Sequence, residues 1–425
     1  MLKSLPTDCS TLTLPDLDLI ASETELVIRK SRRFSPDGFL QTLLKSVVTG
    51  LASLNQIADD LKNRVATPMS VQSMHERFSH KSTAFLLRVL SDLTRQRYQP
   101  ARRVLENSSI KRLVIEDASA QVMPKSNAED FPAHGNHHGS TAGVKIDFTY
   151  DLIAGEVIAH SLEQATRQDK LIGKETLAEV KAGDLVLRDM GYFIIDEFSV
   201  IEDLDACWLT RLPLTTDVAL ESGKALAKLL KSTKKDVLDL QITIGEQRKK
   251  CRLVAIRAEK TVARKRRAER RKQARAKGKQ PSQKALIRDG WHIMLTNLEK
   301  ETFTVAQLAG IYRSRWAVEI QFRAWKQALN LSKALNRKSN EHHLQALVLA
   351  GMIAHQLGMR VGQLMSAQIG RARLSYERLY DTLAGHLAGV ACFMEVPAFS
   401  PDPRHISRNK RTTQSPIESA LQTLT

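Results

Sequence analysis

Cysteine is scarce in this 425-residue chain, and its four cysteines are scattered without a Cys-x-x-Cys pair. Their spacing gives neither a disulfide framework nor a structural zinc site, so we expect a reducing, cytoplasmic environment. Long apolar runs are missing as well. The longest one, which starts at Leu344, is interrupted by Gln345, His355 and Gln356. It therefore favours a buried helix over a membrane span, and the first residues lack the apolar block of a signal peptide.

Acidic residues are outnumbered. Asp and Glu total 46 against 64 Lys and Arg, which gives a net charge of +18. Such an excess favours a polyanionic partner, either nucleic acid or an anionic membrane surface. Since no membrane-spanning run is present, nucleic acid is the expected partner. The hydrophobic content of 42% is sufficient for a buried core. The length predicts two or three domains, or one large domain with an insertion.

Residues 1–105 are expected to form an N-terminal helical DNA-binding domain. Within them, Ser53 is a candidate N-cap, Thr67-Pro68 marks a break, and Ser70 marks a second helix start. A helix-turn-helix that enters a DNA groove and an ordinary helical hairpin both fit this pattern.

From residue 106 onward, strands and helices alternate. "IKRLVIED" and "DLVLRD" have the β-branched, apolar character of buried strands, and "CWLTRLP" adds a short one. Two alternating runs joined through Ala154-Gly155 predict a hairpin. This alternation predicts an α/β core with a mixed sheet in residues 106–212. The core is expected to resume in residues 293–390, with a helix from about Thr304 and C-terminal helices, before a polar tail in residues 391–425.

Residues 213–292 are expected to form a basic, mainly β insertion with strands at "DLQITI" and "CRLVAIR". Within residues 249–284, 16 Lys or Arg occur with only Glu259 and Glu269 as acids. A solvated charged helix is one explanation, but so dense a cation cluster repels itself unless an anion binds. We therefore expect contact with a nucleic-acid backbone. The central candidates are Arg264, Lys265, Arg266 and Arg267.

An acid follows each of two predicted strands. Asp117 ends "RLVIED" and Asp189 ends "LVLRD". Ligands bind outside the carboxyl ends of strands in α/β sheets, but aspartate also commonly starts the turn that stops a strand. For either aspartate taken alone, a ligand-binding role and a turn-forming role both fit. Glu116, next to Asp117, is expected to point to the opposite face of the sheet.

A third acid, Glu319, lies among cations in "YRSRWAVEIQFRAWK", residues 312–326. At about 100° per residue in a helix, Tyr312, Arg315, Glu319 and Lys326 share one narrow face. A carboxylate flanked by two cations and a phenol suits a metal-bound phosphodiester. A salt-bridged surface helix with an Arg315–Glu319 pair would explain the charges, but neither the tyrosine nor the excess of cations.

The spacing Tyr312-x2-Arg315-x3-Glu319-x6-Lys326 matches the YREK signature of IS4-family (Tn5-like) DDE transposases of bacterial insertion sequences. "VIEDAS" resembles the first-aspartate block of that family, although Ala118 stands where relatives often have a hydroxylated residue or glycine. "LVLRDMGYF" resembles the second block. The long interval between Asp189 and Glu319 resembles members whose RNase H-like domain is interrupted by a mostly β insertion.

This resemblance implies an RNase H-like catalytic core in which Asp117, Asp189 and Glu319 are catalytic and hold two Mg²⁺ ions, with Mn²⁺ as an alternative ion. Tyr312, Arg315 and Lys326 would contact the DNA ends. The implied activity is cut-and-paste DNA transposition. The alternatives are a metal-dependent nuclease that does not join strands, and an inert DNA-binding regulator.

The resemblance also implies partners. These are double-stranded DNA, as terminal inverted repeats and as target, and a second copy of the chain in a homodimeric synaptic complex at the bacterial nucleoid. Trp291 is either a base-stacking residue, as in relatives that form a hairpin, or a strand tryptophan facing the core.

Two further motifs are weaker. His134, His137 and His138 have a spacing that suits zinc, but no fourth ligand lies nearby. We interpret them as a polar loop that touches DNA. "GSTAG" lacks the lysine of a nucleotide-binding loop, so no nucleotide cofactor is expected.

Overall fold

The structure is a computed structural model that describes residues 15–29, 32–50, 53–62, 69–105, 109–136, 139–152, 156–313, 315 and 341–369. The chain divides into two compact units. Unit 1 contains Met1–Arg103, Ala118–Arg167 and Ala317–Ser415, and unit 2 contains Val104–Asp117, Gln168–Trp316 and Pro416–Thr425.

In the described residues up to 105, unit 1 contains five helices, which confirms the helical character predicted for this region. They are α1 (Leu17–Glu23), α2 (Pro36–Thr49), α3 (Leu54–Lys62), α4 (Val71–Arg77) and α5 (His80–Leu105). Ser53 Oγ accepts a hydrogen bond from the Gln56 amide at 3.3 Å, and Ser70 caps α4 through the Ser73 amide at 3.1 Å. The predicted starts of α3 and α4 are therefore confirmed, while Thr67-Pro68 lies outside the described residues.

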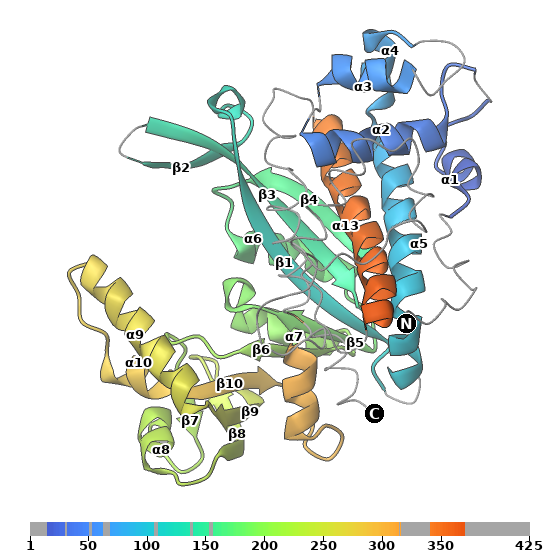
Figure 1. The fold of residues 1–425 in the computed structure, drawn as a ribbon. Coiled ribbons are helices and arrows are strands. Elements are labelled where there is room, and N and C mark those ends of the chain that lie inside the picture. Colours follow the sequence, from blue (N-terminus) through green and yellow to red (C-terminus); the bar gives the residue numbers. More distant parts are fainter. Residues whose placement is uncertain are drawn as a thin grey trace. The chain divides into compact units, whose positions relative to one another are not determined.

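Helix α13 (Glu341–Ile369) packs against α2 and α5 (Figure 1). The side chains of Leu347, Leu349 and Ile353 on α13 are completely buried, which confirms the buried helix predicted from Leu344. Thr83 Oγ1 of α5 donates to Gln345 Oε1 of α13 at 3.1 Å. Within the described residues, none of the helices combines the length and the apolar character needed to cross a membrane.

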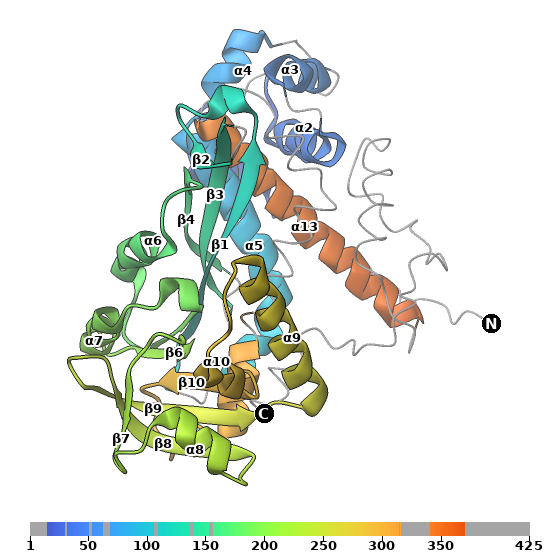
Figure 2. The same ribbon diagram turned by 90° about the vertical axis from the view of Figure 1, so that its left-hand side faces the viewer.

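Strand β1 (Arg112–Met123) is long, and its residues are divided between the two units. The other strands of unit 1 continue the sheet from β1. Strand β3 (Gly139–Asp151) pairs with β1, with β2 (Pro132–Asn136) and with β4 (Glu156–Gln164) (Figure 2). The β3–β4 pairing confirms the predicted hairpin, whose Ala154-Gly155 link lies outside the described residues.

The loop expected around His134 is wrong, because this residue lies in β2. Thr141 Oγ1 of the neighbouring strand donates to the His134 carbonyl oxygen at 2.9 Å, which helps to hold β2 on β3. His137 and His138 lie outside the described residues.

Unit 2 is built on a mixed sheet, which confirms the predicted α/β class. Residues 112–115 of β1 pair in parallel with β5 (Asp184–Arg188), and β5 pairs in parallel with β6 (Cys207–Arg211). The sheet then continues through antiparallel pairs in the order β10, β9, β8, β7. These strands are β10 (Trp291–Thr296), β9 (Lys249–Arg257), β8 (Val237–Ile244) and β7 (Val218–Leu220).

The helices of unit 2 are α6 (Asp169–Thr176), α7 (Ile195–Asp203), α8 (Leu226–Ser232), α9 (Lys260–Ala276) and α10 (Gln283–Arg288). Short 3₁₀ turns lie at Lys125–Asn127 in unit 1 and at Leu177–Glu179 and Met190–Tyr192 in unit 2. A further helix covers residues 305–313. Thr304 caps it, since the Thr304 Oγ1 accepts from the Gln307 amide at 3.3 Å, as predicted.

The mainly β character expected for residues 213–292 is wrong. The strands "DLQITI" and "CRLVAIR" are confirmed within β8 and β9, but α8, α9 and α10 contribute 7, 17 and 6 residues against 3, 8 and 9 in β7, β8 and β9. The basic stretch forms α9 because Ala, Arg, Lys, Glu and Gln are strong helix formers and neither Gly nor Pro interrupts them.

Candidate active site

The register of β1 against β5 brings two candidate carboxylates to the same level. Ile115 is paired with Leu187, and Asp117 and Asp189 each follow that pair by two residues. Asp189 keeps an extended backbone, with φ −81° and ψ 171°. Side chains alternate between the faces of a sheet, and neighbouring strands lie about 4.8 Å apart. Continued by two residues, this register predicts adjacent positions on one face of the sheet for the two aspartates.

Only one of the two aspartates ends its strand. Strand β5 stops at Arg188 and Asp189 begins a 3₁₀ turn, as predicted. Strand β1 continues past Asp117 to Met123, so the predicted strand end at Asp117 is wrong. The residues that follow Asp117, Ala-Ser-Ala-Gln-Val, contain neither glycine nor proline to stop the strand, and this part of β1 pairs with β3.

The opposite face of the same two strands carries a buried ionic network that sequence reasoning missed. Glu116 and Arg188 are 1% and 2% exposed, and Arg188 Nε lies 2.8 Å from Glu116 Oε2. Arg188 also forms an ion pair with Glu197 of α7. Burial raises the pKa of both glutamates, while the charge of Arg188 opposes this rise. Since Glu116 bonds on this face, it points away from Asp117, as predicted.

Tyr312, Arg315, Glu319 and Lys326 are predicted to form one stripe along a helix, and the structure brings the first two of these residues to Asp189. Arg315 is 5% exposed in its side chain, and its Nη2 lies 3.9 Å from Asp189 Oδ1, whose side chain is 35% exposed. The Arg315 guanidinium lies 5.8 Å from the centre of the Tyr312 ring. Burial raises the pKa of Tyr312 to about 12. The phenol is therefore protonated at neutral pH and can donate a hydrogen bond.

The remaining residues of the stripe, Glu319 and Lys326, lie outside the described residues. The alternative Arg315–Glu319 surface pair is untested for the same reason. In the part of the chain that the structure describes, no group of three or more His, Cys, Asp or Glu side chains could hold a metal ion. Asp117 and Asp189 offer two carboxylates, which are the hard oxygen donors that Mg²⁺ prefers.

Helix α9 has an inner and an outer face. On the inner face, Arg266 Nη1 donates to the Trp291 carbonyl at 3.4 Å, Arg267 Nε to the Leu286 carbonyl at 2.9 Å, and Arg270 makes two bonds to Asp289 at 2.7 and 2.6 Å. These bonds fasten α9 beside α10 and β10 (Figure 2). The outer face is exposed and basic. It contains Arg264, Lys265, Ala268, Arg271, Lys272 and Arg275.

This division separates the four predicted DNA contacts of the basic stretch. Arg264 and Lys265 face solvent, whereas Arg266 and Arg267 use N–H groups to hold α9 in place.

Trp291 lies in the core of unit 2. Its side chain is 4% exposed, and the Arg257 guanidinium covers its ring at 4.3 Å from the centroid. The base-stacking alternative is wrong for this arrangement, because no ring face is open to a base. The residue is the second of a Gly-Trp-His sequence in which His292, on the other face, is exposed. Arg266 Nη2 lies 3.2 Å from His292 Nδ1. Partial burial of the imidazole against its neighbours and the Arg266, Arg211 and Arg313 cations lower the pKa of His292 to about 4.

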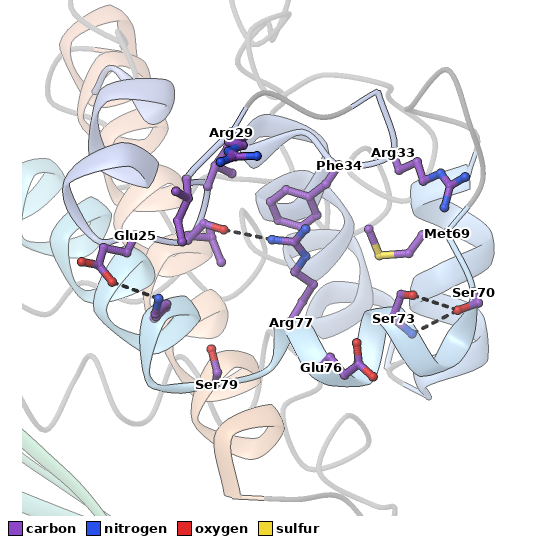
Figure 3. A pocket seen from close by; sticks show the side chains of 14 residues that line it. Glu25, Arg29, Arg33, Phe34, Met69, Ser70, Ser73, Glu76, Arg77 and Ser79 are labelled. Carbon is purple, nitrogen blue, oxygen red and sulfur yellow. Dashed lines mark hydrogen bonds and ion pairs between the residues drawn. The ribbon is translucent and has the colours of Figure 1, made fainter.

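A separate pocket of about 1000 Å³ lies in unit 1 (Figure 3). Its polar side chains hold helices together. Arg77 donates to the Leu26 carbonyl oxygen at 3.0 Å and stacks over Phe34 at 4.6 Å, and Lys81 pairs with Glu25 at 2.9 Å. Cations and acids both line this pocket, and its polar contacts are structural.

Comparison with known proteins identifies the class. The profile of the family described as "Transposase DDE domain" matches residues 108–355, more than half of the chain. The chain therefore belongs to this transposase family. It is an enzyme of DNA transposition that acts on DNA and depends on a divalent metal ion.

Curated relatives are transposases of bacterial insertion sequences, which confirms the predicted resemblance. The IS231E transposase of Bacillus thuringiensis subsp. finitimus is 26% identical over 402 residues, which cover 88% of this chain and 84% of that protein. The IS231F transposase of Bacillus thuringiensis subsp. israelensis is 26% identical, with coverage of 87% and 83%. The IS1151 transposase of Clostridium perfringens is 19% identical, with coverage of 75% and 72%.

Among solved structures, a piggyBac transposase synaptic complex with hairpin DNA aligns with 91% of this chain and 78% of that chain. The TM-score is 0.36 and the identity is 13%, a likeness too low to support an argument about the fold.

The position of Trp291 generates a first prediction. Trp291→Ala should lower the free energy of unfolding by about 3–5 kcal/mol, because it removes a large buried ring. Urea denaturation followed by circular dichroism measures this change. The control Lys250→Ala alters an exposed side chain of the neighbouring strand β9 and should stay within about 0.5 kcal/mol of the parent. A Trp291→Ala protein with parental stability and impaired DNA cleavage would contradict the core assignment.

Proposed function

We propose that this transposase excises its element by cutting phosphodiester bonds at the element ends and then joins the freed 3′ ends to target DNA. Asp117, Asp189 and Glu319 are the catalytic carboxylates in this proposal. The observation that supports it is the parallel register of β1 and β5, in which Ile115 pairs with Leu187 two residues before each aspartate. The spacing of the Tyr312–Lys326 stretch supports Glu319 as the third.

The strand pairings support an RNase H-like core. The antiparallel pair β3–β4 adjoins β1 on one side, and the parallel strands β5 and β6 follow on the other. Residues 213–292 interrupt this core between β6 and β10. The proposed segments are the helical DNA-binding domain in residues 1–105, the core in residues 106–212 and 293–390, and the tail in residues 391–425.

The residues fit a magnesium site. We assign Asp117, Asp189 and Glu319 as ligands of two Mg²⁺ ions, since all three offer hard oxygen donors. Bound metal would supply Lewis-acid chemistry, lowering the pKa of the attacking water and stabilising the leaving oxygen.

The other side chains of the stripe bind and orient the DNA end. The Tyr312 phenol, protonated at neutral pH, donates to a phosphate oxygen. Arg315 lies close to Asp189, so its cation balances the carboxylate charge while a phosphate is held beside it. Lys326 contributes a further cation on the same helical face.

DNA recognition requires further contacts and a second copy of the chain. The outer face of α9 follows the DNA backbone, and the α3–α4 helices find the terminal inverted repeats. Two element ends are brought together by a homodimer at the bacterial nucleoid. The capping bonds at Ser53 and Ser70 support the helix pair as a stable unit.

The catalytic assignment generates a second prediction. Asp117→Asn, Asp189→Asn and Glu319→Gln should each lower the cleavage rate by about three orders of magnitude or more. Affinity for DNA carrying the terminal repeats should persist, since the removed carboxylates hold metal rather than phosphate. The measurements are gel-based cleavage with Mg²⁺ and fluorescence anisotropy binding.

The matched control for these variants is Asp196→Asn on α7, an exposed aspartate of unit 2, which should behave as the parent. A variant that still cleaves at the parental rate would refute its assignment. Joining of a 3′-hydroxyl end to a second DNA should also be lost. A parent that cuts DNA but never joins strands would be a nuclease instead.

The two faces of α9 generate a third prediction. The outer triple variant Arg271→Gln, Lys272→Gln and Arg275→Gln should weaken DNA binding. It should also reduce the slope of log affinity against log salt by about 2–3, because each lost phosphate contact removes about 0.9. Its stability should stay within about 0.5 kcal/mol of the parent.

The matched inner-face control is Arg270→Gln, which loses two bonds to Asp289. It should cost about 1–3 kcal/mol of unfolding free energy and leave the salt slope of the folded protein unchanged. An outer variant with the parental salt slope would show that α9 does not meet the DNA backbone.

A further inference from the structure

The buried network behind the two aspartates is larger than an ordinary ion pair. Arg188 of β5 bonds to three elements. It forms ion pairs with Glu116 of β1 and Glu197 of α7, and its Nη2 donates to the Gly173 carbonyl oxygen of α6. Thr176 Oγ1 of α6 donates to Glu116 Oε1 at 2.6 Å. All of these residues belong to unit 2.

The backbone of Arg188 is tied as well. Its carbonyl oxygen accepts a hydrogen bond from Thr210 Oγ1 of β6 at 3.1 Å. The packing over the network is close, because a Cβ added at Gly173 would lie 2.9 Å from Tyr192 Cδ1. The guanidinium is therefore fixed from several directions.

We propose that Arg188 is a positioning residue for catalysis. It holds the register of β1 against β5, so that Asp117 and Asp189 stay side by side on one face of the sheet. This inference rests on the proposed function. Glu116 and Arg188 immediately precede the two aspartates in sequence and bond across the two strands on the opposite face. A slip of one residue would move an aspartate to the other face, and it would break this ion pair.

The geometry of arginine suits this role. A planar guanidinium presents its N–H groups in a fixed fork, so it pairs well with two carboxylates only when they lie near its plane in matching directions. Strand pairing alone defines a register through many equivalent backbone bonds. The side-chain network adds a bond that only one register satisfies.

The test uses a variant that removes the network without leaving a buried charge. The triple variant Glu116→Met, Arg188→Met and Glu197→Met carries no charge at these positions, and replacement of buried ionic groups by hydrophobic residues of similar volume is often neutral or stabilising. We expect near-parental thermal unfolding. We also expect Mn²⁺ affinity, measured by calorimetry on the DNA-free full chain, to weaken about 10- to 100-fold, as is typical when the support of metal ligands is lost.

A matched control removes another ion pair of the same unit. Arg270 Nη2 of α9 lies 2.6 Å from Asp289 Oδ1, and neither residue lies on β1, on β5 or on the helix of residues 305–313. Arg270→Met with Asp289→Asn should leave Mn²⁺ affinity at the parental value. Should the triple variant fail to fold, Arg188→Lys keeps the charge but loses the fork, and about 10-fold weaker Mn²⁺ binding is expected.

A folded triple variant or Arg188→Lys protein with parental Mn²⁺ affinity and cleavage would overturn the positioning role and leave the proposed function standing. Parental Mn²⁺ affinity and cleavage in Asp117→Asn and Asp189→Asn would instead overturn the proposed function, and the positioning role with it.

Discussion

The parallel pairing of β1 with β5 is the constraint on which the site depends. Four consecutive residue pairs, from Arg112 with Asp184 to Ile115 with Leu187, set the register. Leu185, Leu187 and Ile115 are fully buried, and each such side chain contributes about 1.5–3 kcal/mol through burial. Val114 and Val186 on the other face are buried as well, so apolar packing on both faces holds the two strands together in this register. Asp117 and Asp189 inherit their relative position from that register.

Charge is used in two different ways in unit 2. Arg188, Arg252, Arg267 and Arg270 bind carboxylates or carbonyl oxygens inside the protein and stabilise the fold. The outer face of α9 carries cations that project into solvent. The net charge of +18 is therefore a poor measure of the surface offered to DNA, because some arginines are occupied by intramolecular bonds.

Much of this arrangement follows from local sequence. Strands β5, β6, β8 and β9, the β3–β4 hairpin and the caps at Ser53, Ser70 and Thr304 are predictable, because hydrophobic pattern and capping chemistry act over a few residues. The length of β1 is not, because its continuation past Asp117 depends on pairing with the distant β3. The burial of Trp291 likewise depends on tertiary contacts. Alternation places one of Trp291 and His292 inside, and the covering Arg257 comes from β9.

The network around Arg188 shows the same limit. A charged residue directly after each apolar run, Glu116 after Leu113–Ile115 and Arg188 after Leu185–Leu187, is a visible signal in the sequence. That they bond to each other requires the strand register, and that Glu197 joins them requires the placement of α7. Helix α9 is one of the explanations that the sequence leaves open for the basic stretch. Its helix-forming composition, without Gly or Pro, favours the helix, while its charge alone does not distinguish a helix from another DNA-binding segment.

The central claim is tested most directly by a crystal structure of the DNA-bound protein, from crystals grown with Mn²⁺. An anomalous difference map then locates the metal. The account predicts a peak roughly 2.0–2.4 Å from carboxylate oxygens of both Asp117 and Asp189, next to the phosphate at the element end. A metal bound away from these two side chains, or aspartates on opposite faces of the sheet, would contradict it.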